Sequence, residues 1–140
     1  MKDKPYLAAD LLIKDKYIPR ILVIDDEQDV SLFFKTCLED QGFRVTFYSD
    51  PFKALSTFQP QYYDLAIIDI RLPKINGFEL YEKIRKKDSN IKVCFITAFE
   101  EYYDSLKEQF PKLDVKCFIK KPVSSQDLVK HVMSEIISKD

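Results

Sequence analysis

The stretch Leu65-Ala66-Ile67-Ile68-Asp69-Ile70-Arg71-Leu72-Pro73 is a short apolar run that reaches an acid and then breaks at a proline. A continuous apolar run of this length is typical of a strand that is covered on both faces, as in parallel sheets. In such sheets ligands bind outside the carboxyl ends of the strands, which is where Asp69 lies. Asp is also common wherever a strand gives way to a loop, so Asp69 alone leaves a functional and a structural role open.

The same kind of run recurs along the chain and predicts five strands that alternate with five helices. The strands are expected at residues 21–24, 43–47, 65–69, 91–96 and 115–119. Such alternation is typical of a doubly wound, flavodoxin-like α/β fold with a parallel sheet, and right-handed crossovers favour the strand order 2-1-3-4-5. In that order a crevice opens between the first and third strands, so their acidic ends become neighbours.

Cap signals and helical spacing locate the helices between these strands. Ser49 or Asp50 can cap the second helix, and Ser124 can cap the last one. The 3.6-residue period predicts inward-facing aromatic residues, among them Phe33 on the first helix and Phe52 on the second.

Length and composition predict one globular domain. The chain has 140 residues, of which 46% are hydrophobic and 32% charged, enough to build a core and too apolar for a disordered chain. The domain is expected over residues 21–139, and residues 1–20 are expected to be an N-terminal extension that forms a short helix or a loose arm. Only two glycines occur, which excludes a glycine-rich phosphate-binding loop.

Charge and cysteine usage exclude several partners. The formal net charge is −1, from 22 basic and 23 acidic residues, so no face is prepared for nucleic acid or anionic lipid. No apolar run is long enough for a membrane helix, and a cytoplasmic location is expected. The cysteines Cys37, Cys94 and Cys117 are far apart and set among apolar residues. We therefore predict reduced, buried thiols and no zinc site.

The carboxyl ends of the predicted strands collect residues of complementary chemistry. Asp25–Glu27 follow the first strand, Asp69 ends the third, Thr97 the fourth, and Lys121 follows the fifth. Carboxylates can hold an octahedral magnesium ion, a central carboxylate can act as an in-line nucleophile, and the ammonium and hydroxyl can bind phosphoryl oxygens. Seen alone, the three consecutive acids are more typical of a solvated turn than of a cation site.

These residues resemble the receiver domain of two-component response regulators. The resemblance rests on the acidic pair Asp25-Asp26, on Asp69-x-x-Leu72-Pro73-x-x-x-Gly77, and on the pairs Thr97-Ala98 and Lys121-Pro122. It implies that the protein is a phosphoacceptor and not an enzyme, beyond assisting its own phosphotransfer and slow dephosphorylation. Asp69 would take a phosphoryl group from the phosphohistidine of a sensor histidine kinase or a histidine phosphotransfer protein.

The resemblance also implies a metal site for Mg²⁺. Asp26, Asp69 and the backbone carbonyl of Arg71 would ligate the ion directly, and Asp25 would act through a bound water.

It further implies a switch. Lys121 would pair with the phosphoryl group, Thr97 would move to hydrogen-bond it, and the rotamer of Phe118 would follow the active state. The Lys121–Pro122 peptide bond is expected to be cis. The fourth helix, the fifth strand and the last helix would form the face that binds a downstream protein, with Tyr102 and Tyr103 among its residues.

Two other functions compete with the phosphoacceptor. One is a phosphorylation-independent, receiver-like interaction module, which the complete set of acceptor-site residues argues against. The other is a magnesium-dependent phosphatase with an aspartyl nucleophile, which would need a general acid two residues after Asp69. Arg71 occupies that position, so turnover is not expected.

Overall fold

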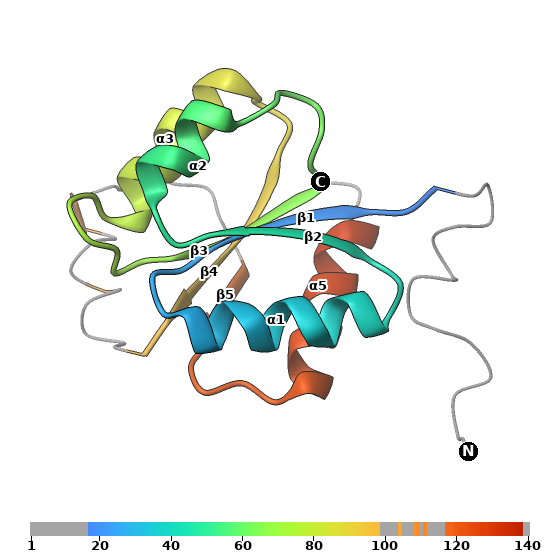
Figure 1. Cartoon of the computed structure of the whole chain (residues 1–140). Helices are drawn as coiled ribbons and strands as arrows, with labels where there is room; N and C mark the ends of the chain where they lie inside the picture. The colour runs from blue at the N-terminus through green and yellow to red at the C-terminus, as the bar shows by residue number, and fades with distance from the viewer. Residues whose placement is uncertain (1–16, 99–103, 105–107, 110, 112–116, 139–140) are drawn as a thin grey trace, which may run out of the picture.

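The computed structural model describes residues 17–98, 104, 108–109, 111 and 117–138. Within these residues one parallel sheet has the strand order β2-β1-β3-β4-β5 (Figure 1). The strands are β1 (Arg20–Ile24), β2 (Arg44–Tyr48), β3 (Leu65–Asp69), β4 (Lys92–Thr97) and β5 (Cys117–Lys120). The predicted fold class and strand order are therefore confirmed.

In the described part of the chain, four helices have defined first and last residues. They are α1 (Gln28–Asp40), α2 (Pro51–Thr57), α3 (Gly77–Lys87) and α5 (Ser125–Ile137). The predicted fourth helix falls on residues 102–110, most of which lie outside the described residues, as do Tyr102 and Tyr103. The predicted N-terminal extension also lies outside them up to residue 16.

The sheet carries an apolar core on each face because successive side chains of a strand point to opposite sides. Ile21 and Val23 of β1 pack into the core beneath α1 and α5, whereas Leu22 and Ile24 pack into the core beneath α2 and α3. Figure 1 shows the two pairs of helices on opposite sides of the sheet. This double cover explains why the strands read as continuous apolar runs.

Side chains cap three of the four helices. Asp50 accepts hydrogen bonds from the first turn of α2, Asn76 from that of α3, and Ser124 from that of α5. The predictions of Asp50 and Ser124 as caps are confirmed. Glu27 stands at the same position of α1, but its side chain makes no cap hydrogen bond.

Two aromatic residues that were predicted to face inward are exposed instead. Phe33 is 40% exposed and Phe52 is 45% exposed. The apolar stripe of α1 is wider than the part of the helix that the sheet covers, which is filled by Phe34 and Leu38. In the short helix α2 the buried positions are Pro51 and Ala54, which leaves Phe52 on the outer side.

The prediction of three reduced thiols is wrong for two of the cysteines. Cys94 of β4 and Cys117 of β5 are joined by a disulfide, with their Cα atoms 4.6 Å apart. The parallel register pairs these two residues directly across the strands, which brings together cysteines that are 23 positions apart in sequence. Cys37 is a free, partly buried thiol.

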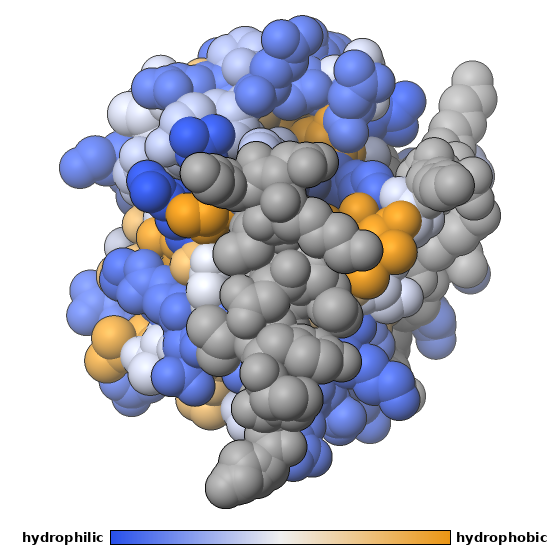
Figure 2. Space-filling model, turned by 90° about the vertical axis from the view of Figure 1, so that its right-hand side faces the viewer, coloured by the Kyte–Doolittle hydropathy of each residue, from blue (hydrophilic) through white to orange (hydrophobic). Residues whose placement is uncertain are grey.

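Among the described residues visible in Figure 2, most of the surface is hydrophilic and apolar residues are exposed at several points. Among the described helices, none combines the length and the apolar character that a membrane span requires.

Candidate functional site

Strand alternation directs three charged side chains to one place. Asp25 follows β1, Asp69 ends β3, and Lys121 follows β5. Each continues the phase of strand residues that pack beneath α1 and α5, such as Val23 and Ile67, so the three side chains share one side of the sheet. Parallel strands bring their carboxyl ends to one edge, and that edge is where the three meet.

Gly77 fixes the backbone at Asp69. Its N–H donates a 2.7 Å hydrogen bond to the carbonyl of Ile70. A Cβ atom at position 77 would lie 2.5 Å from the carbonyl oxygen of Asp69 and 2.8 Å from the Cα atom of Ile70. Because a larger residue would push the end of β3 away, glycine is required here for close packing of α3 against the acid-bearing strand end.

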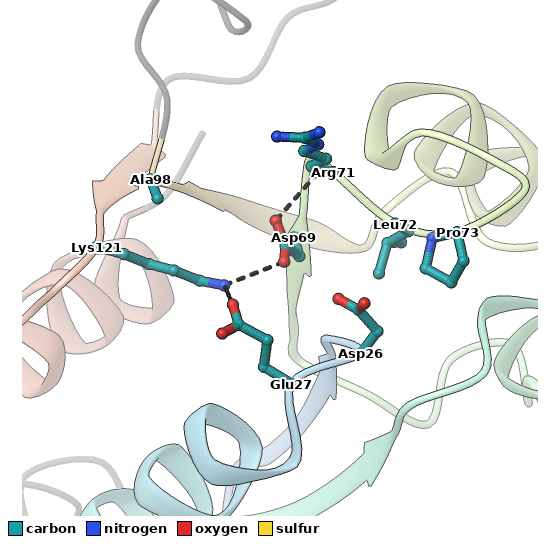
Figure 3. Close-up of a pocket in the computed structure, with 8 residues that line it drawn as sticks. All are labelled: Asp26, Glu27, Asp69, Arg71, Leu72, Pro73, Ala98 and Lys121. Atoms are coloured by element: carbon teal, nitrogen blue, oxygen red, sulfur yellow. Dashed lines mark hydrogen bonds and ion pairs between the residues drawn. The ribbon is translucent and has the colours of Figure 1, made fainter.

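The ammonium of Lys121 is the centre of the site (Figure 3). Its Nζ atom lies 2.9 Å from Asp25 Oδ2, 2.9 Å from Glu27 Oε1 and 3.1 Å from Asp69 Oδ2. The Lys121 side chain is only 12% exposed. Three carboxylates thus share one largely buried cation, which leaves an excess of negative charge at this edge of the sheet.

Asp69 is held in a defined orientation but at an electrostatic cost. Oδ1 accepts a 3.1 Å hydrogen bond from the N–H of Arg71, and the residue is only 4% exposed. Burial, reinforced by the charge of Asp25, raises the pKa of Asp69 from 3.8 to about 6, although Lys121 acts in the opposite direction. At neutral pH the carboxylate is therefore ionised but destabilised, so binding of a further cation would be favourable.

Asp25 is buried completely beside it. Oδ1 accepts a 2.8 Å hydrogen bond from the N–H of Glu27, and Oδ2 faces Lys121 as an ion pair without hydrogen-bond geometry. Burial raises the pKa of Asp25, although the Glu27 N–H and the Lys121 ammonium act to lower it. Burial also acts to lower the pKa of Lys121, but Glu27 and the two Asp carboxylates outweigh it and raise that pKa.

A cavity of about 340 Å³ opens above these groups. Its lining residues are Asp26, Glu27, Asp69, Arg71, Leu72, Pro73, Ala98 and Lys121. Figure 3 shows the exposed Asp26 carboxylate pointing into the cavity, while the Arg71 side chain points away from Asp26. The cavity is large enough for a phosphoryl group and a hydrated ion, and Asp69 lies in its wall.

Neither of the two predicted switch residues, Thr97 and Phe118, is among the residues that line the cavity. Thr97 is buried at the end of β4, and its carbonyl accepts a 2.9 Å hydrogen bond from the N–H of Lys121. Phe118 of β5 is partly buried and stacks on the ring of Phe95, with 5.6 Å between ring centroids. The Lys121–Pro122 peptide bond is cis, as predicted.

Glu27 is the site residue for which the sequence predicted no individual role, only membership of the acidic cluster after the first strand. The structure brings the carboxylate oxygens of Asp25, Glu27 and Asp69 within 4.8 Å of one another, and Asp26 is not in this group. The available signal was its position as the third consecutive acid after β1. Only the structure shows that its side chain extends to Lys121 instead of capping α1.

The donor set fits a divalent cation. Carboxylate oxygens are the hard ligands that Mg²⁺ prefers, and Asp25, Asp26 and Asp69 all lie at or next to the cavity. Asp25 Oδ2 is a buried oxygen without a hydrogen bond in the described part of the chain. An acidic cluster with one lysine can therefore bind a cation and a phosphoryl group together.

The family model that describes the response regulator receiver domain matches residues 21–133. The chain therefore belongs to the response regulator receiver domain family, whose members act in two-component signal transduction.

Relatives and solved structures agree with this assignment. The response regulator SaeR of Staphylococcus aureus (strain USA300) is 27% identical over 112 residues, which are 80% of this chain and 48% of SaeR. The chain thus spans about half the length of the curated relatives it matches. The non-phosphorylated HemR receiver domain from Leptospira biflexa has a TM-score of 0.76 at 30% identity, covering 87% of this chain and 97% of that one. A CheY-like receiver domain protein from Methanospirillum hungatei JF-1 also has a TM-score of 0.76, at 27% identity, covering 86% of this chain and 94% of that one.

Proposed function

We propose that the protein is a phosphoacceptor response regulator in which Asp69 takes a phosphoryl group from a histidine kinase or a histidine phosphotransfer protein. The observation that carries this proposal is the arrangement of Asp69, a nearly buried carboxylate in a cavity wall, 3.1 Å from the Lys121 ammonium. The phosphoacceptor domain would span residues 21–139.

The reaction follows from these contacts. A carboxylate oxygen of Asp69 attacks the phosphorus of the phosphohistidine, the phosphorus–nitrogen bond breaks, and the imidazole leaves with the bonding electron pair. The Arg71 N–H and Lys121 orient the carboxylate before attack. Lys121 then pairs with the phosphoryl oxygens, which offsets part of the added negative charge.

Mg²⁺ would be held by Asp26, Asp69 and the carbonyl of Arg71, with Asp25 acting through water. When bound, the ion neutralises the excess carboxylate charge and the charge that develops on the phosphoryl oxygens. Since burial disfavours the charged carboxylates, a bound cation would also stabilise the fold.

Phosphorylation would act on a partner-binding surface through Thr97 and Phe118. Thr97 ends β4 and its carbonyl accepts a hydrogen bond from the N–H of Lys121, whereas Phe118 lies in β5 and packs on the core ring of Phe95. A shift of Thr97 toward the phosphoryl group would free space for this ring to move. The downstream protein would bind the face formed by residues of the fourth helix, β5 and α5.

Intact mass spectrometry tests the proposal. The purified chain is incubated with acetyl phosphate and Mg²⁺, and Asp69→Asn serves as the matched control because it keeps the size of the side chain. We expect the wild type to gain the mass of one phosphoryl group, and to gain none in the presence of a chelator. A wild type that stays unmodified under these conditions would instead support an interaction module that works without phosphorylation.

A further inference from the structure

Glu27 occupies a helix-capping position but does not cap its helix. The corresponding residues of α2, α3 and α5, which are Asp50, Asn76 and Ser124, all accept hydrogen bonds from their own helices. Glu27 Oε1 instead lies 2.9 Å from Nζ of Lys121, a residue 94 positions away. Because a side-chain cap would stabilise the start of α1, the contact of Glu27 with Lys121 forgoes that stabilisation.

The Lys121 ammonium is already engaged by three carboxylates, through hydrogen bonds to Glu27 and Asp69 and an ion pair with Asp25. It carries three protons and faces the carboxylates of Asp25, Glu27 and Asp69 at 2.9 to 3.1 Å. A phosphoryl group on Asp69 brings further anionic oxygens to the same ammonium. The phosphoryl oxygens then compete with the existing carboxylates for this ammonium.

Burial decides which of these carboxylates can leave the ammonium most easily. Asp25 is fully buried and is held by the N–H of Glu27, while Asp69 carries the phosphoryl group itself. The side chain of Glu27 is 62% exposed, so its carboxylate can return to water at little cost.

Glu27 also lies where the cavity meets a neighbouring groove. A second, mainly apolar groove of about 490 Å³ adjoins the first, and Glu27, Ala98 and Lys121 line both. Phe33 and Val123 are among the apolar residues of this groove. A phosphodonor that approaches Asp69 from this side passes the negative charge of Glu27.

We propose that Glu27 is a positioning residue that holds Lys121 in the resting site and selects against highly charged phosphodonors. Its carboxylate competes with the arriving phosphoryl group for the ammonium and repels the donor in proportion to the donor's charge. This inference rests on the proposed phosphoacceptor function and concerns the regulation of the same site.

The test compares two small donors on the full chain with Mg²⁺. Acetyl phosphate is a dianion at neutral pH, and phosphoramidate carries one net negative charge. Transfer breaks the phosphorus–oxygen bond of the first, releasing acetate, or the phosphorus–nitrogen bond of the second, releasing ammonia that water then protonates to ammonium. The rate at which Asp69 gains the phosphoryl group is followed by intact mass.

We expect Glu27→Gln to react about fivefold faster than the wild type with acetyl phosphate and about twofold faster with phosphoramidate, as screened Coulomb repulsion near a surface predicts. Glu27→Asp keeps the charge and should stay within about twofold of the wild type by the same reasoning. Added salt should speed the wild type more than Glu27→Gln. Glu39→Gln removes the same charge from the far end of α1, where Glu39 pairs with Lys35, and should leave both rates unchanged.

The outcomes separate the inference from the proposed function. A Glu27→Gln variant that is no faster than the wild type, or that gains equally with both donors, overturns the role of Glu27 while leaving Asp69 as acceptor. A fall of both rates together with a loss of stability would show that Glu27 only supports the start of α1. If neither donor phosphorylates the wild type, the proposed function fails and the inference fails with it.

Discussion

Charged side chains have different kinds of partner at the amino and carboxyl ends of the strands. At the amino ends, Asp64 accepts hydrogen bonds from the N–H of Arg20 at 2.8 Å and from the hydroxyl of Tyr17 at 2.5 and 2.6 Å. Burial and the bond to Asp64 raise the pKa of Tyr17 to about 12, so the phenol remains a neutral donor. Asp88 accepts a 2.8 Å hydrogen bond from the N–H of Gln61. Each of these acids has donors supplied by the fold.

The lysine at the amino end is satisfied in the same way. Nζ of Lys92 donates to the carbonyls of Glu135, Ile136 and Ser138 at the end of α5, where the helix dipole favours a cation. At the carboxyl ends, by contrast, three acids share the single ammonium of Lys121. The amino end is therefore complete as it stands, whereas the carboxyl end gains from an added cation.

Replacing Lys121 should lower the stability of the fold more than any of the other changes described below. Lys121→Met leaves buried carboxylates without a cation, and we expect the free energy of unfolding at pH 7 to fall by about 4 kcal/mol. Without the ammonium the pKa values of Asp25 and Asp69 rise further, so the loss should shrink as the pH falls toward 5 and these acids take up protons. Urea unfolding at both pH values measures this, and a loss independent of pH would contradict the account.

Reducing the disulfide perturbs the sheet without altering the charged side chains at either end of the strands. Reducing Cys94–Cys117 releases a loop of 23 residues and should lower the free energy of unfolding by about 3 kcal/mol. Unfolding with and without tris(2-carboxyethyl)phosphine, which reduces disulfides at both pH 5 and pH 7, measures the effect. The change should be the same at pH 5 and pH 7, and a pH-dependent change would link the disulfide to the acidic site.

Replacing Lys92 is the matching test at the amino ends of the strands. Lys92→Met removes an ammonium that binds helix carbonyls, and we expect a loss of about 2 kcal/mol. No buried acid is left without its cation, so the loss should be equal at pH 5 and pH 7. A loss confined to pH 7 would show that both ends depend on acid–lysine balance.

Replacing an acid should have opposite signs at the two ends. The folded-state pKa of Asp69 is raised to about 6, so its ionisation lowers stability as the pH rises from about 4 through about 6. Asp69→Asn removes this cost, and we expect stability without Mg²⁺ to increase by about 1 kcal/mol at pH 7 and to be unchanged at pH 4. Asp64→Asn weakens satisfied hydrogen bonds and should lower stability. A stabilised Asp64→Asn, or a destabilised Asp69→Asn, would remove the distinction between the ends.

Sequence reasoning reached the sheet, its strand order and the positions of Asp25, Asp69 and Lys121 at one edge. These features follow from local patterns, because apolar runs with polar ends, alternating with helices, leave few topologies. The pairing of Cys94 with Cys117 depends on strand register, which no local pattern contains. The helical period could not show that α1 buries only part of its apolar stripe, so Phe33 was placed wrongly.

Within the site, the contacts of Lys121 likewise could not be predicted from local sequence patterns. Its position at a strand end could be read from the sequence, but its sharing among three carboxylates depends on side-chain conformations. Glu27 shows this most clearly, since a helix-capping position predicts a local hydrogen bond and the side chain makes a distant one. The packing of Gly77 against Asp69 likewise needs the tertiary structure to be seen.

Locating the phosphoryl group tests the central claim most directly. After treatment with acetyl phosphate and Mg²⁺, borohydride reduces an aspartyl phosphate to homoserine, which tandem mass spectrometry identifies by residue. The account predicts homoserine at position 69, within the peptide that contains Leu65–Pro73, and none there in Asp69→Asn. Homoserine at a different position, or phosphoryl transfer that continues in Asp69→Asn, would contradict it.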